Sequence, residues 1–203
     1  MGSSNRFVGE KEGCEMRRIA VVVAALMVCV MAVVGCGGQT KEAKEYMTKA
    51  DNAFENLDKV LSETSKKSND LLTKAFTGDI SGIQSNPKML EEMSATLDNA
   101  IKELEKVSSD YAKIRDLKGV EDYVEYANAM INAIKVEIEL VKAGQQLIAK
   151  LAPIAAAGDW VKFAETIKQS AAEATKITEL TTKVDKLLKD AREIKSEKKL
   201  GES

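Results

Sequence analysis

The sequence predicts an all-α protein, an up-down-up-down antiparallel four-helix bundle of long, coiled-coil-like helices that follows an N-terminal leader. Three observations predict it. The chain has only 2 Pro in 203 residues, and Ala, Lys, Glu and Leu dominate beyond the leader. Apolar residues recur there in alternating steps of three and four, the spacing of helices packed as in coiled coils. A single uninterrupted apolar run, residues 19–34, precedes this pattern.

The leader has the order of parts found in an export signal. Arg17 and Arg18 form a basic segment, and the apolar run follows them directly. Met16 stands immediately before the two arginines, and three acidic residues lie upstream of it, which is unusual for such a segment. We therefore expect residues 1–35 to be a signal peptide that begins at Met16, with residues 1–15 a misassigned extension.

The end of the leader, Val33-Val34-Gly35-Cys36, resembles the bacterial lipobox, although Val34 stands where alanine or serine is commoner. The resemblance to bacterial lipoproteins implies cleavage between Gly35 and Cys36, diacylglyceryl transfer to the Cys36 sulfur, and further acylation such as palmitate. It also implies anchoring to the cell envelope, facing the periplasm or exterior. The alternative is an uncleaved membrane anchor, because the apolar run is close to the minimum of about 17 residues for a spanning helix.

The rest of the chain divides into a lipidated tether at 36–40, a bundle at 41–198 and a disordered tail at 199–203. The four runs of apolar residues in the bundle span 47–75, 90–114, 124–152 and 160–191. Further apolar residues flank each run and widen the apolar stripe, which suits a bundle core better than a two-stranded seam.

Turn-forming residues separate the four runs. Gly, Asp, Asn and Pro cluster between positions 77 and 87, Gly119 ends the second run, and Gly158-Asp159 ends the third and begins the fourth. Connections this short place successive helices antiparallel. Pro153 lies inside the third run, and we expect it to kink or shorten the last turn of that helix.

The usual catalytic and metal-binding residues are scarce. The chain has no His, and Cys36 is the one Cys beyond the leader, which leaves no His or Cys cluster for metal binding or nucleophilic catalysis. Acidic residues fall mostly between the core positions, as on solvated helix faces. The net charge of -2 without a basic stripe disfavours nucleic-acid binding. We expect no enzyme, no cofactor and no metal.

Two features suggest binding. Thr64, Ser68, Gln145 and Ser170 are polar or small residues at core positions, at similar heights in an antiparallel bundle. They form either a small polar pocket for a ligand or hydrogen bonds that fix the helix register.

The second feature is aromatic and aliphatic residues at the membrane-distal end: Phe76, Ile80, Trp160 and Phe163. They form either a partner-binding tip or a cap on the core. We therefore expect a structural or protein-interaction module, attached to the membrane through lipid on Cys36 and binding an envelope or extracellular protein. The alternative is a bundle that binds a small molecule.

Overall fold

The computed structural model describes the backbone of residues 11–77, 79, 81–86 and 88–201. Side chains are described within these ranges from residue 38 onward, except at positions 69, 72, 75 and 76. The regular structure of the described residues is entirely helical, which confirms the predicted all-α class. The side chains of the predicted signal peptide, including the cleavage-site residue Gly35, and the Cys36 side chain lie outside the described residues.

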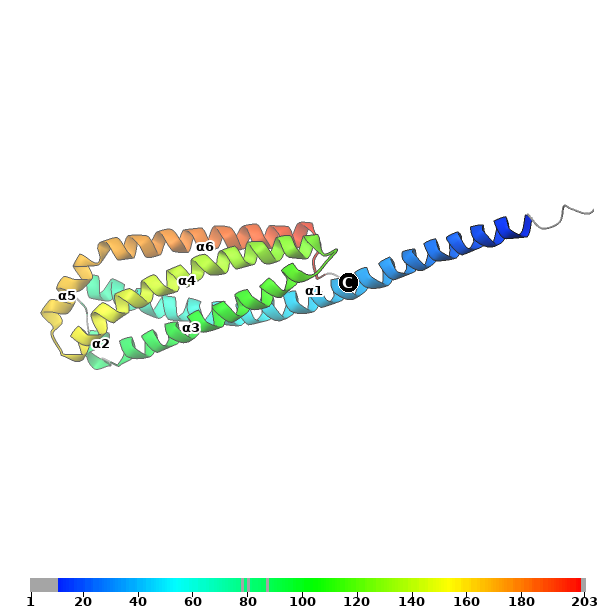
Figure 1. Cartoon of the computed structure of the whole chain (residues 1–203). Coiled ribbons are helices and arrows are strands. Elements are labelled where there is room, and N and C mark those ends of the chain that lie inside the picture. Colours follow the sequence, from blue (N-terminus) through cyan, green and yellow to red (C-terminus); the bar gives the residue numbers. More distant parts are fainter. Residues whose placement is uncertain (1–10, 78, 80, 87, 202–203) are drawn as a thin grey trace, which may run out of the picture.

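Four long helices dominate: α1 (Lys11–Phe76), α3 (Met89–Ala112), α4 (Glu121–Ala156) and α6 (Ala171–Glu197). Two short helices, α2 (Ser81–Ser85) and α5 (Trp160–Gln169), and a 3-10 turn, η1 (Lys113–Asp116), complete the described elements. The long helices lie side by side, and α2 and α5 are together at one end, opposite the α3–α4 connection (Figure 1).

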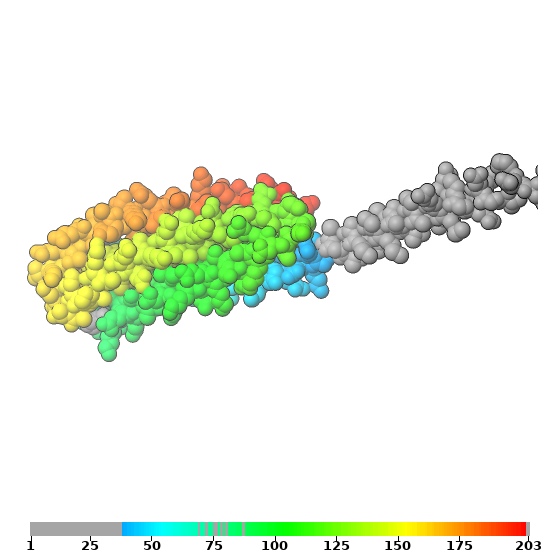
Figure 2. Space-filling view, viewed as in Figure 1, coloured from blue at the N-terminus to red at the C-terminus, as the bar shows by residue number. Residues whose placement is uncertain are grey.

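The long helices pack in chain order. α1 packs on α3, α3 on α4 and α4 on α6, whereas α1 and α6 have little direct contact in the described part of the chain. In the view of Figure 2, α3, α4 and α6 form most of the visible face, and α1 is seen mainly at one end. The bundle is therefore closed more tightly on the α3–α4 side than between α1 and α6.

The core follows the predicted three-and-four spacing. α4 packs between α3 and α6, and it therefore buries residues on more than one face. Leu104, Tyr111, Ile134 and Phe163 are among the largest fully buried side chains. Each apolar side chain of this size stabilises the fold by roughly 1.5–3 kcal/mol when it is buried.

The fourth predicted helix is interrupted, and in this respect the sequence-based prediction is wrong. The structure divides that segment at Ser170, where α5 ends and α6 begins. The Ser170 hydroxyl donates to the Thr166 carbonyl at 2.8 Å, and the Ser170 backbone leaves helical geometry at φ -88° and ψ 18°. A serine whose side chain bonds to the preceding turn often bends a helix in this way.

The structure describes the chain beyond α6 as far as residue 201, and the first residues of the tail predicted at 199–203 form a turn. Lys199 adopts a φ of 51°, and the Leu200 amide donates to the Lys195 carbonyl at 3.0 Å. This pattern is a Schellman cap, in which the residue after the left-handed position packs against the helix. Leu200 is accordingly 6 % exposed and belongs to the core. Pro153 lies inside α4, which continues to Ala156.

Candidate functional site

A cavity of about 330 Å³ lies inside the bundle, bounded by all four long helices and by α2 and α5 at one end. Most of its wall is aliphatic, including Leu97, Leu140, Leu147, Ile177 and Val184. The volume lies at the lower end of the range of known small-molecule sites, about 300–1,000 Å³. The cavity is therefore large enough for a ligand of modest size.

Small residues create this space. Gly144 of α4 lies in the wall, and a Cβ atom added there would have Leu97 Cδ1 as its nearest neighbour, at 3.9 Å. On α1, Thr64 and Ser68 occupy core positions where a leucine would reach further across the bundle. The Thr64 hydroxyl donates to the Val60 carbonyl of its own helix at 2.8 Å, so it needs no partner across the space.

The cavity reaches solvent between α1 and α6. Ser62 and Ser65 of α1 and Thr181 and Asp185 of α6 line it and are exposed. Asp58 of α1 lines it as well and is half-buried. Because α1 and α6 have little direct contact, these polar residues form a mouth in front of the aliphatic interior.

Glu137 of α4 is the one titratable residue deep in the described wall. It is 5 % exposed, and its Oε2 atom has no hydrogen-bond partner among the described residues. Burial, together with the nearby carboxylates of Asp58 and Asp185, raises the pKa of Glu137 to about 7. A buried carboxyl without a partner destabilises a fold, so the position of Glu137 in a cavity wall is informative about what the cavity can bind.

The other buried carboxylates of the described chain have partners. Asp51 of α1 accepts hydrogen bonds from Tyr111 and from Tyr126, the latter at 2.8 Å, and pairs with Lys195 at 2.7 Å. Burial is the main cause that raises the pKa of Tyr111, and the same holds for Tyr126. This cluster joins α1, α3, α4 and α6 near the α3–α4 connection, and its satisfied bonds indicate a structural role.

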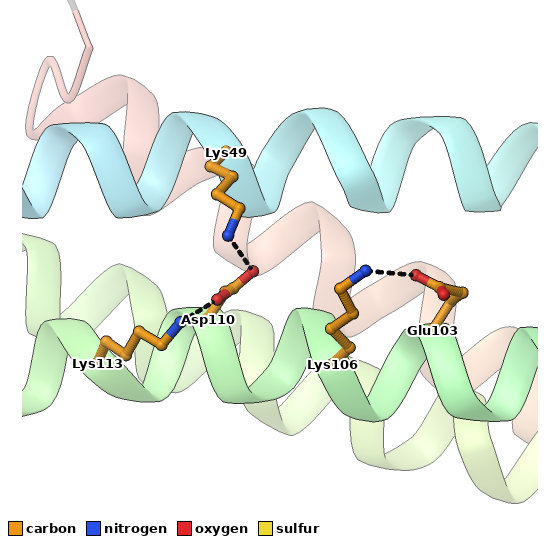
Figure 3. Close-up of polar contacts among 5 residues, drawn as sticks. All are labelled: Lys49, Glu103, Lys106, Asp110 and Lys113. Carbon is orange, nitrogen blue, oxygen red and sulfur yellow. Dashed lines mark hydrogen bonds and ion pairs between the residues drawn. The ribbon is translucent and has the colours of Figure 1, made fainter.

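Asp110 of α3 is a second satisfied carboxylate. It lies between Lys49 of α1, at 3.2 Å, and Lys113, at 2.5 Å, as Figure 3 shows. The hydrogen bond from Lys113 is the main cause that lowers the pKa of Asp110. In the same view, Lys106 and Glu103 form a pair on the exposed surface of α3. Such exposed pairs contribute little to stability.

The predicted polar pocket is assembled in part. Thr64 and Ser68 line the cavity, whereas Gln145 and Ser170 are not among its described lining residues. Gln145 donates to Asp98 of α3 at 2.5 Å, and Ser170 is buried at the junction of α5 and α6. Both are therefore engaged in bonds within or between helices.

Sequence reasoning missed Glu137, although a signal for it exists. Met130, Ala133, Glu137, Leu140 and Gly144 form a second row on α4 with steps of three and four. This row runs beside the one used to predict the helix. A carboxylate in such a row, between apolar and small residues, indicates a buried acidic group rather than a solvated face.

Two of the four residues of the predicted aromatic tip, Trp160 and Phe163, have described side chains. Phe163 is fully buried and lines the cavity, so it is not available to a protein partner. Trp160 is half-buried and packs edge-on against Phe163, with ring centroids 6.0 Å apart. The Phe76 side chain and Ile80 lie outside the described residues. Trp160 and Phe163 thus cap the core at this end.

The part of the chain whose side chains are described was compared with the requirements of a membrane span and of a metal-binding cluster. Within it, no helix is long and apolar enough to cross a membrane. The apolar run at 19–34 lies outside those residues. Among the same residues, no group of three or more His, Cys, Asp or Glu side chains has an arrangement that could hold a metal ion.

The chain was also compared with known proteins. Comparison with protein-family models, curated proteins and solved structures finds no match for this chain.

Proposed function

We propose that the helical domain binds an apolar or amphiphilic small molecule in the cavity between α1 and α6. The observation that carries the proposal is an aliphatic cavity of about 330 Å³ whose wall contains Glu137, a buried carboxyl without a hydrogen-bond partner for Oε2. Binding sites for small molecules combine an apolar interior with a few well-placed polar groups, and this cavity has that composition.

The contrast between the two ends of the bundle supports this role. Near the α3–α4 connection, buried side chains fill the core, and the polar groups of Asp51, Tyr111 and Tyr126 bond to one another. Around Gly144, short side chains leave space and a carboxyl lacks a partner. A purely structural bundle gains stability from filling such a space, because a cavity costs about 24 cal/mol per Å³.

The setting of the domain is also part of the proposal. We propose that the protein is a lipoprotein held on the bacterial cell envelope by lipid on Cys36, facing the periplasm or exterior. The resemblance of residues 33–36 to the lipobox supports this location. We further propose that α1, α3, α4 and α6 run up, down, up and down. The connections through α2 and α5 lie at one end of the helices and the α3–α4 connection at the other, which supports this order (Figure 1). A structural or protein-interaction role has less support, because Phe163 is withdrawn into the core.

The proposal is tested with the full chain in phosphatidylcholine nanodiscs and octanol as a neutral probe. Trp160 is the single Trp of the sequence and packs on Phe163 of the cavity wall, so its fluorescence reports on occupancy. The parent should give a saturable change. Gly144→Leu should fill the cavity and weaken binding at least about tenfold. Ala149→Leu, on the exposed face of the same helix, is the matched control and should bind as the parent does.

Two results would overturn the proposal. The first is a parent fluorescence signal that rises linearly with octanol, as in partitioning into the bilayer. The second is a saturable signal that Gly144→Leu leaves unchanged, which would place the probe outside the cavity. Empty nanodiscs measured in parallel give the amount of octanol that the lipid takes up.

A further inference from the structure

The cavity wall has a charge of one sign. Three of its described residues are acidic: Glu137 in the interior, and Asp58 and Asp185 toward the mouth. None of the described lining residues is Lys or Arg. The side chains between and around the carboxylates are aliphatic or carry hydroxyl groups, so nothing described in the wall balances the negative charge.

We infer that the ligand is a hydrophobic cation, an amine with an aliphatic or aromatic body, and that the Glu137 carboxylate binds its ammonium group. This inference rests on the proposed function and names the ligand class of the same cavity. The carboxylates of Asp58 and Asp185 attract the cation to the mouth, and Glu137 holds it inside.

The other buried carboxylates of the described chain show what Glu137 lacks. Asp51 is paired with Lys195, and Asp110 lies between Lys49 and Lys113. Each has its cation supplied by the protein. Glu137 is equally buried, at 5 % exposure, and no lysine or arginine is paired with it among the described residues. A ligand ammonium would provide the missing partner, and charge-assisted hydrogen bonds of this kind are the strong ones.

The shape of the wall suits such a molecule. Along α4 the wall extends from Glu137 through Gly144 to Leu151. That span is about 21 Å at a rise of about 1.5 Å per residue, so the carboxyl stands at one end of an elongated apolar surface. An amphiphile bound with its ammonium at Glu137 would place its body against Leu140 and Leu147. An anionic ligand would meet like charge at the mouth and in the interior.

The test compares octylamine, octanol and octanoate, which share one alkyl chain and differ in the charge of the head group. Binding to the full chain in phosphatidylcholine nanodiscs is followed by Trp160 fluorescence at neutral pH, for the parent and for Glu137→Gln. The parent should bind octylamine at least about tenfold more tightly than octanol, and octanoate most weakly. Glu137→Gln should lose the preference for the amine, so that octylamine and octanol bind to it with similar affinities.

Asp185→Asn provides a second variant, since Asp185 is exposed and its substitution leaves the interior intact. It should lower octylamine affinity by a smaller factor, about two- to fivefold, and should lower octanol affinity by less than that. Circular dichroism is the control for folding, and each variant should retain the helical content of the parent.

The outcomes separate the inference from the proposed function. If octanol binds in the cavity and octylamine binds no more tightly, or if its preference persists in Glu137→Gln, the ligand class is wrong and the cavity remains a binding site. Tighter binding of octanoate would also overturn the cation assignment. If none of the three probes binds saturably to the parent, the proposed function itself fails.

Discussion

Glu137→Gln should change how the stability of the protein depends on pH. The free carboxyl has an ordinary pKa of 4.5, and burial among Asp58, Asp185 and apolar residues raises it to about 7 in the folded chain. The folded state therefore binds a proton more readily than the unfolded state. Between these two pKa values, the free energy of unfolding of the parent falls as the pH rises, because ionised Glu137 is disfavoured in the fold.

The size of this effect follows from the two pKa values. The difference between 4.5 and about 7 corresponds to roughly 3 kcal/mol over the whole titration. Between about pH 5 and about pH 8, most of it, about 2.5 kcal/mol, should be lost by the parent. A glutamine side chain in place of Glu137 would keep the size of the group without its titration. The difference in the free energy of unfolding, variant minus parent, should therefore grow by about 2.5 kcal/mol across this interval.

Urea unfolding followed by circular dichroism, at several pH values and for both proteins, measures this difference directly. Taking the variant minus the parent removes the titration of the other carboxylates, which are common to both chains. If the two proteins show parallel pH profiles, Glu137 is either solvated or paired in the folded chain, and the reasoning from its burial is refuted.

Other changes have expected outcomes as well. Asp51→Ala should destabilise the fold by about 3 kcal/mol, measured by urea unfolding, because it breaks a buried network. Glu103→Ala should change stability by less than about 0.5 kcal/mol, since its ion pair with Lys106 is exposed. Equal losses of stability in Asp51→Ala and Glu103→Ala would contradict the distinction between the buried network and the exposed pair. Gly144→Ala should raise the melting temperature, corresponding to about 1 kcal/mol, because helix propensity improves without a clash. Lys199→Gly should also stabilise, by about 1 kcal/mol, since glycine tolerates the positive φ; a lower melting temperature would count against either assignment. Cys36→Ser should remove acyl chains from the intact mass of membrane-extracted protein; an acylated mass would contradict the lipoprotein proposal.

The helices were predictable because their apolar spacing is long and regular. The runs at 90–114 and 124–152 correspond closely to α3 and α4, and the turn residues between the runs mark their ends. The break at Ser170 was not predictable from spacing, because the three-and-four pattern continues through it. A hydroxyl that bonds to the preceding turn decides this geometry, and many serines in helices do not bend them.

For the candidate site, the sequence left two interpretations open and did not indicate the chemistry of the wall. Thr64 and Ser68, polar residues at core positions of α1, suggested either a small pocket or hydrogen bonds that fix the register, and both residues line the cavity. Gln145 was misleading, because a long side chain at the edge of a helix can reach a polar partner on its neighbour, here Asp98. The row of apolar and small residues around Glu137 indicates that this side chain is buried. The size of the space beside it depends on how far α1 and α6 separate, which is a property of packing that the sequence pattern does not contain.

The central claim is that a ligand occupies the space between α1 and α6, and methyl-resolved NMR tests it most directly. The full chain, with labelled leucine and valine methyl groups, is titrated with octylamine. We predict saturable shifts at Leu147 and Val184, which line the cavity, and none at Leu104, which is fully buried outside its described wall. Shifts of equal size at Leu104, or unchanged methyl signals at Leu147 and Val184, would contradict the claim.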